Sequence, residues 1–308
     1  MMLAVKTLAE NTTIFSREVR LMGAEFEFSL VTDNPAWALQ RIESAVKEIT
    51  RIEKLLSTFN EESSVNNINR NASVKPVRVD VETFKLIDRA LQVSALTHGT
   101  FDIAYAIPAT DEDGDVIAIA PVRTLKKEIS LTNYTNIVLD HAAQTVFLKD
   151  KNMRIGFSAV GRGYAADRAK YVMQMEGVSS GVINAGGDLL AWGLQPGNAP
   201  WTIGAADSSK ADSIFANVEI SNMAIATSYN AGITIKKGDI NPVTGFPVSN
   251  IRSVSIIAPT AELALAMTQT VFSTGINTGL YLINKLNQIA CIAVDDHERV
   301  YSSKDIKL

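Results

Sequence analysis

Two glycine-rich segments of this chain contain residue types that can hold a bulky anionic ligand. The first is Gly161-Arg162-Gly163-Tyr164 and the second is Asn184-Ala185-Gly186-Gly187-Asp188. Glycine has no Cβ, so backbone N–H groups in such segments can approach a phosphate closely. Asp188 adds a carboxylate that can bind a hydroxyl, a ring nitrogen or a metal. Gly-Gly-Asp is also ordinary turn sequence, so a purely structural role stays open for this segment.

Hydrophobic periodicity and turn signals predict the elements that position these residues. We expect the first glycine turn to open a helix at Tyr164 that ends at Gly177, so that the two glycine turns flank one helix. The remaining elements expected with clear boundaries are a strand at 17–31, a helix at 34–55, a polar loop at 57–69, a helix at 81–97, strands at 136–139, 145–148 and 153–157, and helices at 261–273 and 278–286. Mostly strands are expected between Trp192 and Ala258, and two more after the last helix. The fold class is therefore α+β.

The composition is that of an ordinary globular protein and narrows the list of partners. The chain has 308 residues, of which 46% are hydrophobic and 20% are charged, with a formal net charge of -4. This balance gives no basic surface for nucleic acid. No segment approaches the roughly 20 apolar residues of a transmembrane helix. We therefore expect neither kind of partner, and the compartment stays open: cytoplasmic, or exported with a leader that this chain does not include.

The cysteine and histidine residues suggest no catalytic or metal site of their own. The single cysteine, Cys291, excludes an internal disulfide and lies in an apolar run, where we expect a small buried hydrophobic residue. His98 is expected at the end of a helix, and His141 and His297 in solvated turns. We see no repeat and no Pro/Ser-rich linker. We therefore expect an N-terminal tail at 1–14 and one bilobed domain at 15–308.

Eight motifs taken in chain order resemble those of the ApbE family, flavin transferases that move FMN from FAD onto a threonine or serine of a target protein. The resemblance runs from Met22 to Phe272. The matching segments are Met22-Gly23-Ala24, Ser57-Thr58-Phe59-Asn60 through Asn69, Gly99-Thr100-Phe101-Asp102, Gly161 to Asp167, Asn184 to Asp188, Ala226-Thr227-Ser228, Asn241 to Gly245, and Ala264 to Gln269. The order of the segments, more than any one of them, carries the resemblance.

The resemblance implies a T-fold-related bilobed domain with antiparallel and mixed sheets that binds FAD in a cleft between its lobes. Phe59 would stack on the flavin ring, a contact worth roughly 1–3 kcal/mol in comparable base stacking. Its alternative is a loop aromatic packed on a helix. The other implied FAD-binding residues are Asn184, Asp188, Thr227 and Ser228, together with Gly163, Gly186 and Gly187, which would cradle phosphates. Asp188 and Arg162 would be the catalytic residues.

The metal site that the resemblance implies is weakened in this sequence. In the family, a backbone carbonyl of the first glycine turn and an Asp and a Thr four residues apart on a late helix hold Mg²⁺. Here Leu265 and Gln269 stand at those two helix positions. The Gly161 carbonyl and the Gln269 amide remain, and Mg²⁺ is usually held through one or two carboxylates. We therefore expect a weak or absent magnesium site.

At two further positions this sequence departs from the family pattern. These departures leave more than one functional hypothesis open. Gly238 stands where the family usually has a histidine, and Asn241 where it has an aspartate. The first hypothesis is an enzyme with a rearranged metal site, either a FAD:protein FMN transferase or an FAD pyrophosphate hydrolase. Whether its turnover is weakened or lost stays open. Its expected partners are FAD and a flavin-accepting protein. The alternative is a non-catalytic FAD- or nucleotide-binding relative that lacks the metal site. A scaffold without any small ligand is the third and weakest reading.

Overall fold

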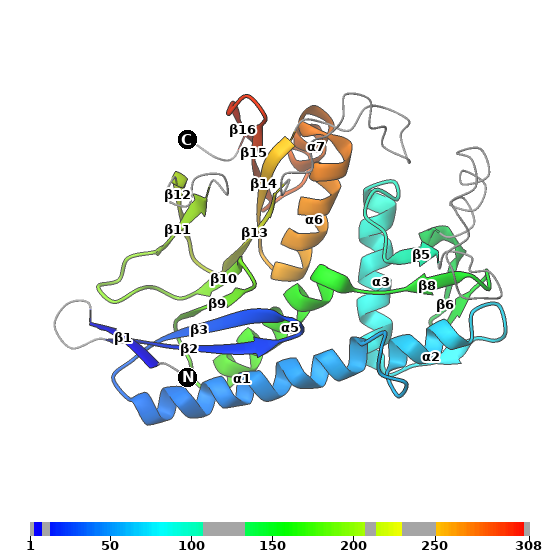
Figure 1. Ribbon diagram of the computed structural model, residues 1–308, viewed down its shortest axis with the longest axis horizontal. Coiled ribbons are helices and arrows are strands. Elements are labelled where there is room, and N and C mark those ends of the chain that lie inside the picture. Colours follow the sequence, from blue (N-terminus) through cyan, green and yellow to red (C-terminus); the bar gives the residue numbers. More distant parts are fainter. Residues whose placement is uncertain (1–2, 8–12, 107–132, 207–213, 230–250, 305–308) are drawn as a thin grey trace, which may run out of the picture. The chain divides into compact units, whose positions relative to one another are not determined.

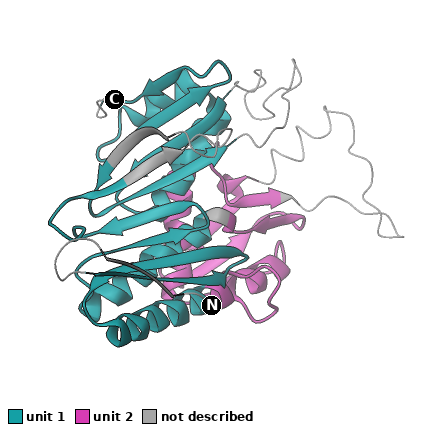
Figure 2. Ribbon diagram, turned by 60° about the vertical axis from the view of Figure 1, so that its left-hand side comes forward, with its two compact units in different colours: residues 1–52, 159–308 teal, residues 53–158 magenta. Residues whose placement is uncertain are grey.

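A computed structural model describes residues 3–7, 13–106, 133–206, 214–229 and 251–304. The chain divides into two compact units (Figure 2). Unit 1 comprises residues 1–52 and 159–308, and unit 2 comprises residues 53–158. Each unit is described by itself below.

A nine-stranded antiparallel sheet forms the centre of unit 1 (Figure 1). In spatial order its strands are β1 (Leu3–Thr7), β2 (Thr13–Leu21), β3 (Ala24–Thr32), β9 (Gly181–Ala185), β10 (Asp188–Trp192), β13 (Met223–Tyr229), β14 (Ile251–Ala258), β15 (Ala290–Asp295) and β16 (Val300–Ser302). A separate ribbon pairs β11 (Trp201–Ala206) with β12 (Ile214–Ile220). The side chains of Phe26, Phe28 and Leu30 on β3 are fully buried, as is Trp192 at the end of β10.

The helices of unit 1 are α1 (Pro35–Leu56), whose last turn reaches unit 2, α5 (Ser158–Met175), α6 (Ala261–Thr274) and α7 (Ile276–Ile283). Helix α6 packs along β13 and β14 (Figure 1). It begins at Thr260, whose side chain accepts a hydrogen bond from the Leu263 N–H, as expected for an N-cap residue. The sheet and α6 together position the residues of interest.

Unit 2 contains short elements held by specific polar contacts. Its helices are α2 (Ser64–Arg70), α3 (Val81–Leu96) and the 3-10 turn η1 (Tyr134–Asn136). Its strands are β4 (Val77–Arg78), β5 (Ala104–Ala106), β6 (Ile137–Asp140), β7 (Thr145–Leu148) and β8 (Met153–Ile155). The buried Asn69 side chain donates to the Ile155 carbonyl at 2.9 Å and accepts from the Ile155 N–H at 2.8 Å, which joins α2 to β8.

The α+β class with antiparallel sheets is confirmed, but several element boundaries differ from those expected. Residues 17–31 form a hairpin rather than one strand, because Met22 (φ 51°) and Gly23 (φ 74°) make a two-residue turn between β2 and β3. The expected loop at 57–69 contains most of α2, which Ser63 caps. Residues 1–14, expected as a tail, supply β1 and the start of β2, which pair in the main sheet.

The largest error concerns the helix expected to begin at Tyr164. Helix α5 begins at Ser158, so Gly161 and Gly163 lie inside its first turns rather than in a turn before it. The second glycine pair lies in the β9–β10 hairpin, with β9 between it and the end of α5. The prediction that two glycine turns flank one helix is therefore wrong.

The predictions for cysteine and histidine agree with the structure. Cys291 on β15 is fully buried, and burial raises the pKa of its thiol to about 12. His98, His141 and His297 are exposed, and His141 makes an edge contact with the Phe84 ring. Within the described ranges we find no helix with both the length and the apolar character needed to cross a bilayer.

Candidate active site

The β9–β10 hairpin places the Asn184–Asp188 segment at one end of the main sheet. Gly186 (φ 69°) and Gly187 (φ 98°) form its two-residue turn, and both adopt the left-handed conformation that favours glycine. The Gly186 N–H donates to the Glu25 carbonyl at 2.8 Å, and the Gly187 N–H donates to Asn184 Oδ1 at 2.8 Å. Both amides therefore have partners inside the protein. The expected cradle of free N–H groups is not present in this turn.

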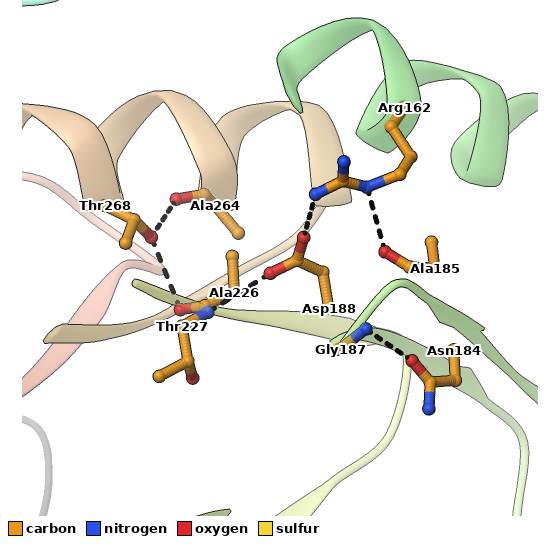
Figure 3. A network of polar contacts seen from close by, with 9 residues as sticks. All are labelled: Arg162, Asn184, Ala185, Gly187, Asp188, Ala226, Thr227, Ala264 and Thr268. Atoms are coloured by element: carbon orange, nitrogen blue, oxygen red, sulfur yellow. Dashed lines mark hydrogen bonds and ion pairs between the residues drawn. The ribbon is translucent and has the colours of Figure 1, made fainter. Parts of the chain in front are cut away.

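Asp188, the first residue of β10, is buried and joins three elements (Figure 3). Its Oδ2 accepts from Nη2 of Arg162 on α5 at 3.0 Å, and its Oδ1 accepts from the N–H of Thr227 on β13 at 3.2 Å. Burial raises the pKa of Asp188, whereas these two contacts act in the opposite direction; the net shift is upward. Both carboxylate oxygens are thus committed to contacts within unit 1.

Arg162 lies in the first turns of α5 and is held at two points. Besides its ion pair with Asp188, its Nε donates to the Ala185 carbonyl at 3.0 Å. The side chain is 23% exposed. A guanidinium has five N–H donors in a planar fork, and contacts with described residues use two of them. The other three donors have no partner among the described residues.

Thr227 extends this network across β13 to β14. Its hydroxyl lies 2.8 Å from that of Ser255, a buried residue directly opposite it in the strand register. Thr268 on α6 is also buried, and its hydroxyl donates to the carbonyls of Ala264 and Ala226 (Figure 3). Ser228 follows on β13 and is half-buried. The structure therefore brings Arg162, Asn184, Asp188 and Thr227 together, as the sequence predicts.

Gly163 has a packing role that the sequence does not reveal. A Cβ on Gly163 would lie 2.7 Å from the Ala261 carbonyl oxygen and 2.7 Å from Leu265 Cδ1 on α6. Glycine is needed here because the two helices approach closely. The expected ligand role of Gly163 stays a prediction beside this packing role.

Asp167 is a second residue of α5 whose role the sequence did not reveal. Its two oxygens accept from the N–H groups of Ala261 and Glu262 at 2.9 Å each, which fixes the start of α6. Burial raises the pKa of Asp167 to about 7. The signal available in the sequence was its place at the end of the Gly161–Asp167 motif.

The donor groups at the expected metal position do not fit Mg²⁺. Leu265 is buried against α5 and supplies only hydrocarbon, whereas Gln269 on the same helix is exposed. Gly161 lies inside α5, where a carbonyl oxygen normally accepts an intrahelical hydrogen bond. In the part of the chain that the structure describes, no three His, Cys, Asp or Glu side chains gather as metal ligands. Gly238 and Asn241 lie outside the described residues.

Phe59, the predicted flavin-stacking residue, belongs to unit 2. Its ring is 95% exposed. The N–H groups of Phe59 and Asn60 both donate to Ser57 Oγ, which fixes the turn that carries the ring. The alternative in which Phe59 packs on a helix is therefore wrong.

Residues 22–293 of the chain match the model of the ApbE family. The chain belongs to the ApbE family. An FAD:protein FMN transferase of Escherichia coli (strain K12) is 26% identical over 272 residues, which are 83% of this chain and 76% of that protein. One from Klebsiella pneumoniae (strain 342) is 24% identical over 308 residues, covering 97% of this chain and 94% of the relative.

Solved structures of ApbE proteins share the fold. The ApbE protein of Thermotoga maritima has a TM-score of 0.79 at 23% identity, covering 94% of this chain and 97% of that one. The apo flavinyl transferase ApbE of Pseudomonas stutzeri has a TM-score of 0.77 at 20% identity, with 97% and 98% covered. Together with the family match, these likenesses confirm the resemblance read from the motifs.

Proposed function

We propose that this ApbE protein is a FAD:protein FMN transferase. Its curated relatives from Escherichia coli and Klebsiella pneumoniae carry that name. The observation in this chain that best supports the proposal is the network of Arg162, Asp188 and Thr227, which joins α5, β10 and β13 at one end of the main sheet. Such a network fixes a cationic side chain beside polar groups, and phosphoryl transfer depends mainly on positioning and charge.

The proposed reaction moves FMN from FAD to a hydroxyl of the acceptor protein. The oxygen of an acceptor threonine or serine attacks the phosphorus of the FMN half and forms a new P–O bond. The P–O bond to the AMP half breaks, AMP leaves, and the hydroxyl proton passes to water. Arg162 would contact the phosphate oxygens, where negative charge is concentrated. No step is assigned to a metal, because the residues at the expected site do not fit one.

Asp188 acts in this proposal as a positioning residue rather than as a base. Both of its oxygens already accept hydrogen bonds, from Arg162 and from the Thr227 N–H. Its role is to hold the guanidinium plane. Asn184, Thr227 and Ser228 would contact polar groups of FAD. Phe59 would stack on the flavin, since its exposed ring leaves the π-face available.

Incubation with FAD and an acceptor protein tests the proposal directly. The acceptor is a protein that the Escherichia coli FAD:protein FMN transferase modifies, and that enzyme is the positive control. We expect flavin fluorescence that stays on the acceptor after denaturation, with AMP released in equal amount. The absence of both products with this protein, while the control enzyme modifies the same acceptor, would refute transferase activity.

A second candidate function is FAD binding without transfer. Leu265 favours it, because a buried hydrocarbon side chain stands where the family resemblance implies a carboxylate. Stacking and hydrogen bonds from the sheet end do not need that carboxylate. FAD binding measured by calorimetry, combined with no AMP release in any buffer, would select this second function over the first.

A further inference from the structure

Neither Leu265 nor Thr268 of α6 offers a free side-chain oxygen to a metal. Leu265 faces Gly163, with its Cδ1 only 2.7 Å from the place of a Cβ on that glycine. Thr268, one turn later on α6, has its hydroxyl bonded to two carbonyls, those of Ala264 and Ala226. A hard cation such as Mg²⁺ needs several oxygen ligands and loses its water reluctantly. Around Leu265 the contact between α5 and α6 therefore serves close packing rather than metal binding.

Arg162, the residue before Gly163 on α5, carries a positive charge. Arg162 points to the end of the main sheet, where Asp188 and the Ala185 carbonyl hold its guanidinium at 3.0 Å each. In Figure 3 the second terminal nitrogen of Arg162 points away from both of these partners. A guanidinium fork fixed at two points keeps its remaining N–H groups in a set direction, and its planar geometry suits a phosphate.

The other basic residues of α5 have different environments. Arg168 pairs with Glu48 of α1 at 3.0 Å and stacks over the Tyr171 ring. Lys170 is half-buried, and burial lowers the pKa of its ammonium group. Of these three residues, Arg162 is the one whose ion pair reaches the β9–β10 hairpin in the part of the chain that the structure describes. Arg162 is thus the basic residue of α5 that contacts the end of the main sheet.

We propose that Arg162 recognises the pyrophosphate of the dinucleotide in place of a divalent cation, so that this chain binds FAD without metal. The inference rests on the proposed function and makes it more specific. Asp188 and Ala185 fix the guanidinium, and its remaining donors contact the phosphate oxygens. Leu265 closes the neighbouring helix contact and excludes a metal ligand from it.

FAD titration of the purified protein, by calorimetry and by quenching of flavin fluorescence, tests this inference. The titration is run in EDTA and again in excess MgCl₂, and we expect equal affinities. Arg162→Met should weaken FAD binding about 10- to 100-fold, the loss expected for charge-assisted hydrogen bonds. Arg168→Met is the matched control on the same helix and should leave the affinity unchanged. Arg162→Lys should bind several-fold more weakly than the parent, because an ammonium cannot keep two anchors and also reach the phosphates.

A double variant keeps the test valid if Arg162→Met folds poorly. Adding Asp188→Asn removes the carboxylate left without its partner, and a thermal melt checks that the variant is folded. Equal FAD affinity in this folded variant and in the parent would overturn the inference. Binding that needs MgCl₂ and disappears in EDTA would also overturn it, while leaving the proposed transferase function standing. No FAD binding in either buffer would overturn both.

Discussion

Two neighbouring residues of α5 face very different surroundings. Arg162 faces the polar end of the main sheet, where Asp188 and the Ala185 carbonyl hold it. Gly163 faces α6, where Leu265 and the Ala261 carbonyl leave no room for a side chain. Two consecutive residues of α5 thus face a charged network on one side and a tightly packed helix contact on the other. The polar groups suited to an anionic ligand therefore gather on the side of α5 that faces the sheet. The side that faces α6 serves packing.

Of the substitutions considered, removal of the Asp188 carboxylate should lower the stability of the protein most. Asp188→Ala leaves the partly buried Arg162 and the Thr227 N–H without their shared acceptor. We expect a loss of about 2–4 kcal/mol in the free energy of unfolding, measured by urea denaturation. Glu298→Ala removes an exposed partner of Arg252 and should cost less than about 1 kcal/mol. Equal losses in the two variants would show that the Asp188 network is no stronger than a surface ion pair.

Adding one methyl group at Gly163, where α5 contacts α6, should lower the stability by a smaller amount. Gly163→Ala forces a Cβ against the Ala261 carbonyl, so we expect a loss of about 1–3 kcal/mol despite the better helix propensity of alanine. Leu265→Ala should not rescue this variant, since the Ala261 carbonyl contact remains and the truncation removes a buried side chain. A neutral or stabilising Gly163→Ala substitution would contradict the close approach of the two helices.

The pH dependence of stability tests the polar anchor of that same contact. Burial raises the pKa of Asp167 from 3.8 to about 7, so the folded state holds its proton more tightly than the unfolded state does. Stability from this group is present below pH 4 and is lost as the pH rises to about 7. Asp167→Asn should therefore show a smaller decline over this window. Parallel curves for the two proteins, from denaturation at each pH, would contradict the raised pKa.

Introducing oxygen ligands on α6 should turn the helix contact into a metal site. Leu265→Asp with Gln269→Thr places a carboxylate and a hydroxyl four residues apart, on one face of the helix. We expect the metal-free variant to melt below the parent, because a charge replaces buried leucine. MgCl₂ should raise its melting temperature and leave that of the parent unchanged. A magnesium-dependent shift in the unmodified protein would show that its metal ligands lie elsewhere.

The smallest expected effect on stability is at the exposed ring of unit 2. Phe59→Ala should weaken FAD binding by at least several-fold, if a stacking contact of roughly 1–3 kcal/mol is lost. Its melting temperature should stay nearly unchanged, because the ring is 95% exposed. Phe59→Trp keeps a π-face and should retain most of the affinity. Unchanged affinity in Phe59→Ala would remove this residue from the FAD site.

The sequence predicted the parts of the molecule that depend on local patterns. The helices near 81–97 and 261–273 begin after the capping residues Asp80 and Thr260, and both were found within a residue or so. The polar residues of the Asn184–Asp188 segment and Thr227 were also singled out, and the structure brings them together.

The errors arose where tertiary contacts decide the local structure. Gly161 and Gly163 have low helix propensity, so a turn was expected, yet the packing of α5 on α6 requires the glycine at 163 inside a helix. The partners of Asp167 lie about ninety residues further along the chain, and no local pattern indicates them. In the hairpin, the Asn184 side chain accepts a hydrogen bond from the Gly187 N–H, which the sequence suggested was free to bind phosphate.

A crystal structure of the protein with FAD, grown in excess MgCl₂, would show whether Arg162 or a metal contacts the pyrophosphate. We expect terminal nitrogens of Arg162 within hydrogen-bonding distance of the pyrophosphate oxygens, with Asp188 still paired to the guanidinium. We also expect no metal beside Leu265 and Gln269. A metal that bridges the pyrophosphate to α6, or a pyrophosphate bound away from Arg162, would contradict this expectation.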